Sequence, residues 1–106
     1  MGAIEKAAMD QLKLLISERL PLRQMVLFGS RARGDADPDS DFDVLVVIDG
    51  PADRSARETV SDCAWETGLD HGIVIAPIVV CRDEWENGPE RYSLLAEAIR
   101  AEGVPV

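Results

Sequence analysis

Basic residues are scarce in this chain. Its 106 residues include 11 Lys and Arg against 20 Asp and Glu, which gives a formal net charge of −9 at pH 7. Proteins that grip nucleic acid usually carry a basic stripe, whereas the basic residues here are spread thinly along the sequence. The composition therefore disfavours direct nucleic-acid binding, and it leaves a small molecule or another protein as the partner.

Cysteines and long apolar runs are also few. Cys63 and Cys81 show no paired metal spacing and lie in apolar segments, which indicates buried free thiols in a reducing cytosol. Charged residues interrupt the N-terminal stretch, so it does not resemble a signal peptide, and no run approaches membrane length. We therefore expect a cytoplasmic protein without membrane contact, folded as one domain over residues 1–106.

Helical and strand patterns alternate along the chain. Apolar spacing predicts an opening helix, two apolar strands, a second helix that ends at Gly68, a third strand and a closing helix that ends at Gly103. Pro77 places the third strand near a sheet edge or a bulge. The pattern predicts the α+β (α/β) fold class, with a small mixed sheet flanked by helices. The expected segments are Ile4 to Leu20, Met25 to Phe28, Phe42 to Ile48, Ala52 to Thr67, Ile73 to Val80 and Pro89 to Ile99.

The acidic stretch before the second strand is the most informative part of the sequence. Asp41 and Asp43 flank Phe42, and because side chains alternate along a strand, the two carboxylates point to the same side. Adjacent carboxylates in water-poor surroundings are costly unless they share a proton or a cation. The alternative is an ordinary strand beside a solvated acidic loop. The pattern favours a divalent cation bound by Asp41 and Asp43.

The residues between the two strands supply features of a phosphate site. Gly29 allows a tight turn and a close backbone approach, and Ser30 offers a hydroxyl group. A short helix through Ala32 would aim free N–H groups at an anion. Arg31 and Arg33 add forked donors suited to phosphate. Two carboxylates together with substrate phosphates suit Mg²⁺, which rarely takes all its ligands from protein.

The pattern of Gly29, Ser30, a ten-residue spacer, Asp41 and Asp43 resembles the DNA polymerase β-like nucleotidyltransferase superfamily. The small size and acidic balance are similar to a minimal nucleotidyltransferase (MNT), the antitoxin-type partner of HEPN proteins. The resemblance covers most of the chain, including LFGSRARGDADPDSDFDVLVV, the APIVV strand followed by Glu-Trp, and the closing IRAEGVPV.

This resemblance implies a function and a set of site residues. Gly29 and Ser30 would hold the triphosphate of ATP, and Asp41 and Asp43 would be the catalytic, Mg²⁺-binding pair. AMP from ATP would be placed on a hydroxyl group of a HEPN toxin, which the antitoxin neutralises. The other possibility is that the domain neutralises the toxin simply by binding it.

One departure from the family pattern keeps both possibilities open. Members of the superfamily usually carry a third carboxylate on a later strand, and the matching strand here, Ile73 to Val80, has none. Its expected position is Val74, with Ala76 the next candidate. Losing a general base typically costs a factor of about 10² to 10⁴ in rate. Asp70 lies just before this strand and is a weak candidate for the third carboxylate.

The remaining residues of note are expected to be structural. His71, the only histidine, is expected to face solvent in a turn. Trp65, Trp85 and Tyr92 are expected to pack in a core or an interface rather than against adenine.

Overall fold

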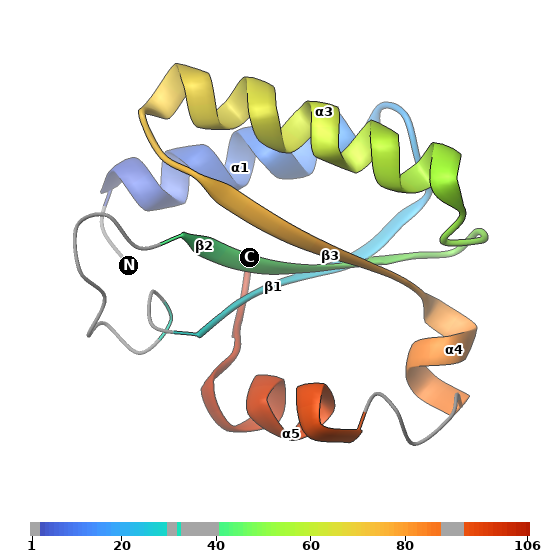
Figure 1. Ribbon diagram of the computed structural model, residues 1–106. Coiled ribbons are helices and arrows are strands. Elements are labelled where there is room, and N and C mark those ends of the chain that lie inside the picture. The colour runs from blue at the N-terminus through green and yellow to red at the C-terminus, as the bar shows by residue number, and fades with distance from the viewer. Residues whose placement is uncertain (1–2, 30–31, 33–40, 88–92) are drawn as a thin grey trace.

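The computed structural model describes residues 3–29, 32, 41–87 and 93–106. In this part of the chain, the strands form a small sheet and helices lie on both of its faces (Figure 1). The helices are α1 (Ala3–Ser17), α3 (Arg54–His71), α4 (Arg82–Asn87) and α5 (Ser93–Glu102). The strands are β1 (Leu22–Phe28), β2 (Phe42–Ile48), β3 (Ile75–Cys81) and β4 (Val104–Pro105).

The sheet is mixed, as the sequence predicts. Its strand order is β3-β2-β1-β4. Strand β1 pairs antiparallel with β2 and with β4, while β2 and β3 run parallel. Strand β3 therefore lies at an edge, which confirms the position expected from Pro77, because an edge strand tolerates a residue without an N–H group.

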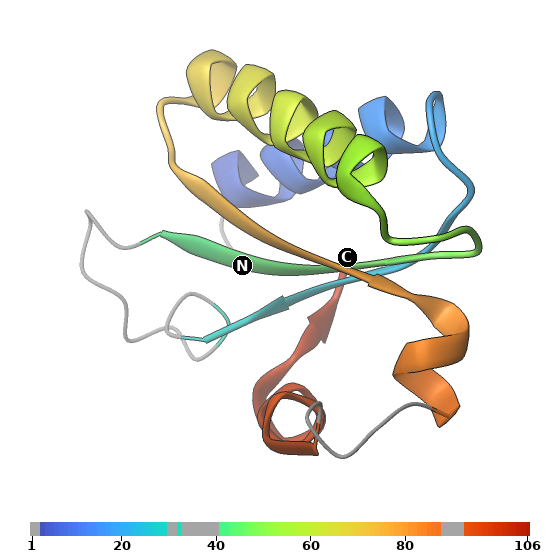
Figure 2. The ribbon, with the colours of Figure 1, turned by 45° about the vertical axis from the view of Figure 1, so that its right-hand side comes forward.

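Each face of the sheet carries its own hydrophobic core. Helices α1 and α3 cover one face and helices α4 and α5 lie on the other (Figures 1 and 2). Even-numbered residues of β2, from Phe42 to Ile48, are buried under α1 and α3. Leu45 and Val47 pack on the opposite side with Val80 and Ile99. Asp43 shares the alternation of Leu45 and Val47, so its side chain belongs to the α4 and α5 face.

Helix α3 is longer than the sequence predicts. It begins after Asp53, whose carboxylate accepts the N–H of Ala56 at 2.9 Å, and it ends at Gly72 with φ +67°. The prediction that Gly68 ends this helix is wrong. Gly68 lies inside it, where an added Cβ would be 2.6 Å from the carbonyl oxygen of Ile73. The glycine instead gives room for the chain as it returns toward β3.

The other boundaries differ less. Helix α1 ends at Ser17 instead of near Leu20, because the chain tightens into a turn through residues 18–20. The prediction that the closing helix stops at Gly103 is confirmed. Strand β4, which follows it, is missing from the prediction. None of the helices in the described part of the chain combines the length and the apolar character that crossing a bilayer requires.

Candidate active site

The turn after β1 brings the backbone against an acidic side chain. Gly29 has φ +76°, a conformation that L side chains rarely adopt. A Cβ atom at this position would lie 2.6 Å from Oδ2 of Asp43. The carbonyl oxygen of Gly29 accepts the N–H of Ala32 at 3.1 Å, which closes the turn. The dihedral angle therefore favours glycine here, and a larger residue would also displace the carboxylate of Asp43.

Strand pairing explains why these two residues meet. Phe28, the last residue of β1, lies opposite Asp43 in the antiparallel pairing with β2. The residue after Phe28 therefore turns directly over the carboxylate. Ser30, Arg31 and Arg33, the other predicted phosphate ligands, lie outside the described residues and stay predictions.

Asp41 and Asp43 form an acidic pair at the start of β2. Asp41 is exposed and Asp43 is half-buried, while Phe42 between them is buried in the opposite core. Burial raises the pKa of Asp43, and the neighbouring charge of Asp41 raises it further. A carboxylate such as Asp43, whose ionised form is disfavoured in this way, is stabilised by a cation shared with its neighbour.

The donor set fits a cation that takes only part of its ligands from protein. In the described part of the chain, no three His, Cys, Asp or Glu side chains gather into a metal site. Mg²⁺ is commonly held by one or two carboxylates, with water and substrate phosphates completing its octahedron. Asp41 and Asp43 are donors of the kind that suits this role.

The parallel register of β2 and β3 identifies the residue beside the acidic pair. Asp43 lies opposite Ala76, on the same face of the sheet. Val74, the first expected position of a third carboxylate, instead lies before β3. Its carbonyl oxygen accepts the N–H of Phe42 at 2.9 Å, and its side chain is 61% exposed. Ala76 is therefore the direct cross-strand neighbour of Asp43, and it carries no acid.

The structure places Asp70 away from the acidic pair. Asp70 lies in the last turn of α3, which covers the face of the sheet opposite to Asp43. Its carboxylate accepts a hydrogen bond from Nε2 of Gln11 on α1, at 2.8 Å. Asp70 precedes the strand, as expected, but it belongs to α3, which continues past Gly68. This placement provides no support for Asp70 as the third carboxylate.

Gln11 also contacts the only histidine. Its Oε1 atom lies 2.9 Å from Nε2 of His71, so one glutamine links the two last residues of α3 to α1. His71 is half-buried in a helix, not exposed in a turn. No sequence signal points to Gln11, because a lone glutamine on an amphipathic helix is ordinary.

A glycine turn over a paired-acid strand, in a small mixed sheet flanked by helices, defines the layout of a nucleotidyltransferase. The family comparison agrees with this class. The chain belongs to the nucleotidyltransferase domain family, whose model matches residues 9–101.

Two relatives from Methanocaldococcus jannaschii are similar in sequence. The chain is 38% identical to "Putative protein adenylyltransferase MJ0604" over 76 residues, which cover 71% of each protein. It is 36% identical to "Putative protein adenylyltransferase MJ0141" over 58 residues, which cover 55% of this chain. That match spans 59% of the length of the second relative.

Two solved structures share the fold. A crystal structure of a toxin-antitoxin with AMP-PNP matches with a TM-score of 0.66 and 18% identity, covering 91% of this chain and 69% of that chain. A tri-AMPylated Shewanella oneidensis HEPN toxin in complex with MNT antitoxin matches with a TM-score of 0.59 and 17% identity. Here the match covers 96% of this chain and 70% of that chain. The fold class predicted from the sequence is confirmed by these similarities.

Proposed function

We propose that this domain transfers AMP from ATP to a hydroxyl group of a HEPN protein partner, with Mg²⁺ as cofactor, as the antitoxin of a toxin-antitoxin pair. The observation that carries the proposal is the contact between the Gly29 turn and Asp43, beside Asp41. The relatives named as adenylyltransferases support the transferred group, and the AMPylated HEPN toxin complex supports the class of acceptor.

The proposed transfer is an in-line displacement at phosphorus. The acceptor oxygen forms a bond to the α-phosphorus of ATP while the bond from that phosphorus to the bridging oxygen breaks. Pyrophosphate leaves, and the hydroxyl proton passes to a base. A bound Mg²⁺ supplies charge neutralisation at the phosphate oxygens.

We assign cation binding and phosphate binding to different residues of this chain. Asp41 and Asp43 would hold the cation, and the bare backbone of Gly29 would let the triphosphate approach them. Ser30, Arg31 and Arg33 are proposed to bind the remaining phosphate oxygens. Burial and the charge of Asp41 raise the pKa of Asp43, so a cation would offset a cost that the ionised carboxylate carries in the folded domain.

A second candidate function has its own supporting observation. Ala76 occupies the position beside Asp43 and supplies no carboxylate to accept the proton. A domain with this gap is slow in transfer unless the partner or the substrate provides the base. Such a domain would neutralise its partner by binding alone.

Intact-mass measurement separates the two functions. The domain is incubated with ATP, Mg²⁺ and a HEPN protein identified from a neighbouring gene, and the mass of the HEPN protein is recorded. Transfer predicts increments of one AMP unit that disappear in Asp41→Asn and Asp43→Asn. Asp10→Asn, an exposed acid on α1 paired with Lys6, is the matched control and should leave the increments unchanged. Absence of any increment, with neutralisation that survives Asp41→Asn combined with Asp43→Asn, supports the binding module instead.

A further inference from the structure

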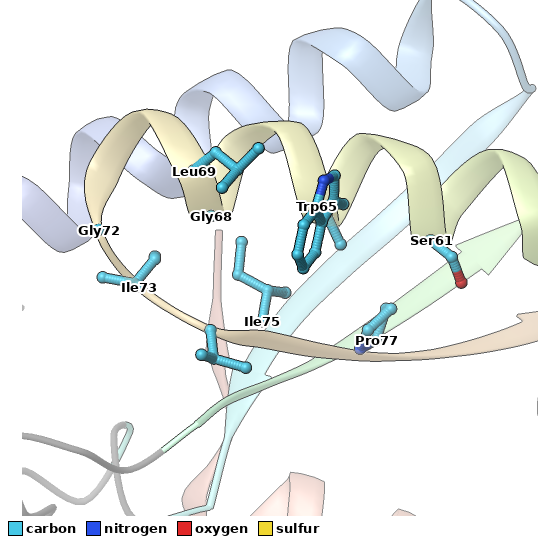
Figure 3. A pocket seen from close by; sticks show the side chains of 10 residues that line it. Ser61, Trp65, Gly68, Leu69, Gly72, Ile73, Ile75 and Pro77 are labelled. Carbon is cyan, nitrogen blue, oxygen red and sulfur yellow. The ribbon is translucent and has the colours of Figure 1, made fainter.

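An apolar groove lies between α3 and the edge strand β3, apart from the acidic pair. It encloses about 460 Å³. Figure 3 shows Trp65 and Leu69 on α3 beside Ile75 and Pro77 on the strand side. Trp65 is 70% exposed and Leu69 is 66% exposed. Trp65 is therefore not part of the core, and a groove lined by such side chains is suited to cover by another molecule.

Helix α3 presents two adjacent ridges at this groove. Ser61, Trp65 and Leu69 follow one another at four-residue spacing along one ridge, which is apolar at Trp65 and Leu69. A parallel ridge of acids runs beside it, formed by Glu58, Asp62, Glu66 and Asp70. Asp62 and Glu66 are exposed and precede the lining residues Trp65 and Leu69 by three positions, so we call these two acids the acidic rim of the groove.

The acidic ridge does not serve the stability of α3. Carboxylates at four-residue spacing repel one another and destabilise a helix. The two ends of the ridge have partners, since Glu58 meets Arg54 at 3.0 Å and Asp70 meets Gln11 at 2.8 Å. Asp62 and Glu66 are exposed in the middle of the ridge. Basic groups from outside the chain would relieve their repulsion.

An added β-strand is a poor occupant of the open edge. The carbonyl oxygen of Val74 accepts a hydrogen bond from Phe42, so the backbone groups of the even-numbered residues face β2. The backbone groups of the odd-numbered residues of β3 therefore face away from the sheet. Pro77 stands in this outward row and has no N–H to donate. The missing donor lies near the middle of the edge, where a strand would need it.

A second copy of this chain is also a poor occupant. Two copies that meet groove to groove by a twofold axis would place the acidic rim of one against the same rim of the other. The chain carries a net charge of −9, so repulsion adds to this mismatch.

We propose that the groove docks an amphipathic helix of the acceptor protein, with apolar side chains that fill the groove and Lys or Arg residues that meet the acidic rim. The inference rests on the proposed function, because it names the surface by which the acceptor is held. The lining from Ser61 to Gly72 matches about three turns of a docked helix.

The groove lies near the start of β2 but on the α1 and α3 face of the sheet, whereas the side chain of Asp43 lies on the other face. Val74 lines the groove and its carbonyl oxygen accepts the N–H of Phe42 at 2.9 Å. Phe42 lies between Asp41 and Asp43. A protein held in the groove would therefore have to reach around the start of β2 to bring a hydroxyl group to the acids.

Stapled helical peptides of about 16 residues test the groove directly. Their leucines follow helical spacing in several registers, and each register is made once with Lys and once with Glu at the flanks. Binding is followed by the emission of Trp65. We expect a Lys-flanked peptide to shift the emission and to bind about tenfold tighter than its Glu-flanked twin. Trp65→Phe should remove the shift, and Leu69→Glu, at an exposed position, should remove the binding.

Charge reversal is the decisive control. Asp62→Lys combined with Glu66→Lys, both at exposed positions, should invert the preference in favour of the Glu-flanked peptide. Asp41→Asn combined with Asp43→Asn should leave peptide binding unchanged, so a failure of AMP transfer does not affect this test. The inference is overturned if no register binds, if both flanks bind equally, or if sedimentation shows a dimer that Leu69→Glu dissolves.

Discussion

Replacing Gly29 with alanine tests whether the close approach to Asp43 builds the site. Gly72 is the matched control, because it has φ +67° against +76° at Gly29, yet a Cβ there would have nothing within 4 Å. An L residue in this region costs roughly 1–2 kcal/mol, so both variants should lose about that much unfolding free energy. Only the methyl group at position 29 would lie 2.6 Å from Oδ2 of Asp43.

The side chain of Asp43 is half-buried at the end of a strand, so it can rotate away from the new methyl group. We therefore expect the clash in Gly29→Ala to displace the carboxylate instead of unfolding the domain. Urea unfolding should give similar losses for Gly29→Ala and Gly72→Ala. Calorimetry with ATP and Mg²⁺ should show at least a tenfold loss of affinity for Gly29→Ala alone, or about 1.4 kcal/mol.

A variant that lacks the Asp43 carboxylate separates the effect of the clash from the effect of the dihedral angle. Asp43→Ala removes the atom that the methyl group would strike, so any cost of Gly29→Ala beyond its dihedral strain should vanish in the double variant. Normal ATP binding by Gly29→Ala, with Mg²⁺ present, would refute the assignment of Gly29 to the nucleotide site. An equal loss of binding in Gly72→Ala would show that the effect comes from general destabilisation.

Two further predictions follow from local geometry. Because burial and Asp41 raise the pKa of Asp43, the metal-free folded domain holds this proton more tightly than the unfolded chain, and this group's contribution to stability falls as pH rises above about 3.9. Asp43→Asn should remove this decline, which urea unfolding from pH 3.5 to 7 in EDTA can measure, and an unchanged pH profile would contradict the raised pKa. Gly68→Ala should destabilise the domain by about 1–3 kcal/mol, although alanine favours helix, because its Cβ meets the Ile73 carbonyl at 2.6 Å. A more stable Gly68→Ala variant in thermal unfolding would show that the returning chain can shift at little cost.

The sequence predicts the central part of this fold well. The apolar run ending at Gly29 and the alternation of Asp41, Phe42 and Asp43 lie within one strand pair, so local periodicity determines which way the side chains point. Pro77 likewise predicts an edge strand, because proline has no N–H group to donate within a sheet. These features depend on few long-range contacts, and the structure agrees with them.

Features that depend on tertiary contacts are harder to predict. A glycine such as Gly68 ends many helices, but here it permits the close passage of Ile73, which no local pattern reveals. The identity of Ala76 as the neighbour of Asp43 depends on strand register, which β2 and β3 fix only when they pair. Strand β4 has two residues, one of them proline, and exists because β1 offers it an edge.

The pairing of β4 with β1 has a consequence for synthesis of the chain. Val104 and Pro105 lie beside Leu27 and Val26, and the N–H of Val106 bonds to the carbonyl oxygen of Met25. These contacts join segments about 80 positions apart, so they form only after the elements from α1 to α5 have been synthesised. Until then, the outer edge of β1, which leads into Gly29, is open to pairing with other chains. During translation, this edge is where we expect a chaperone to protect the nascent domain from aggregation.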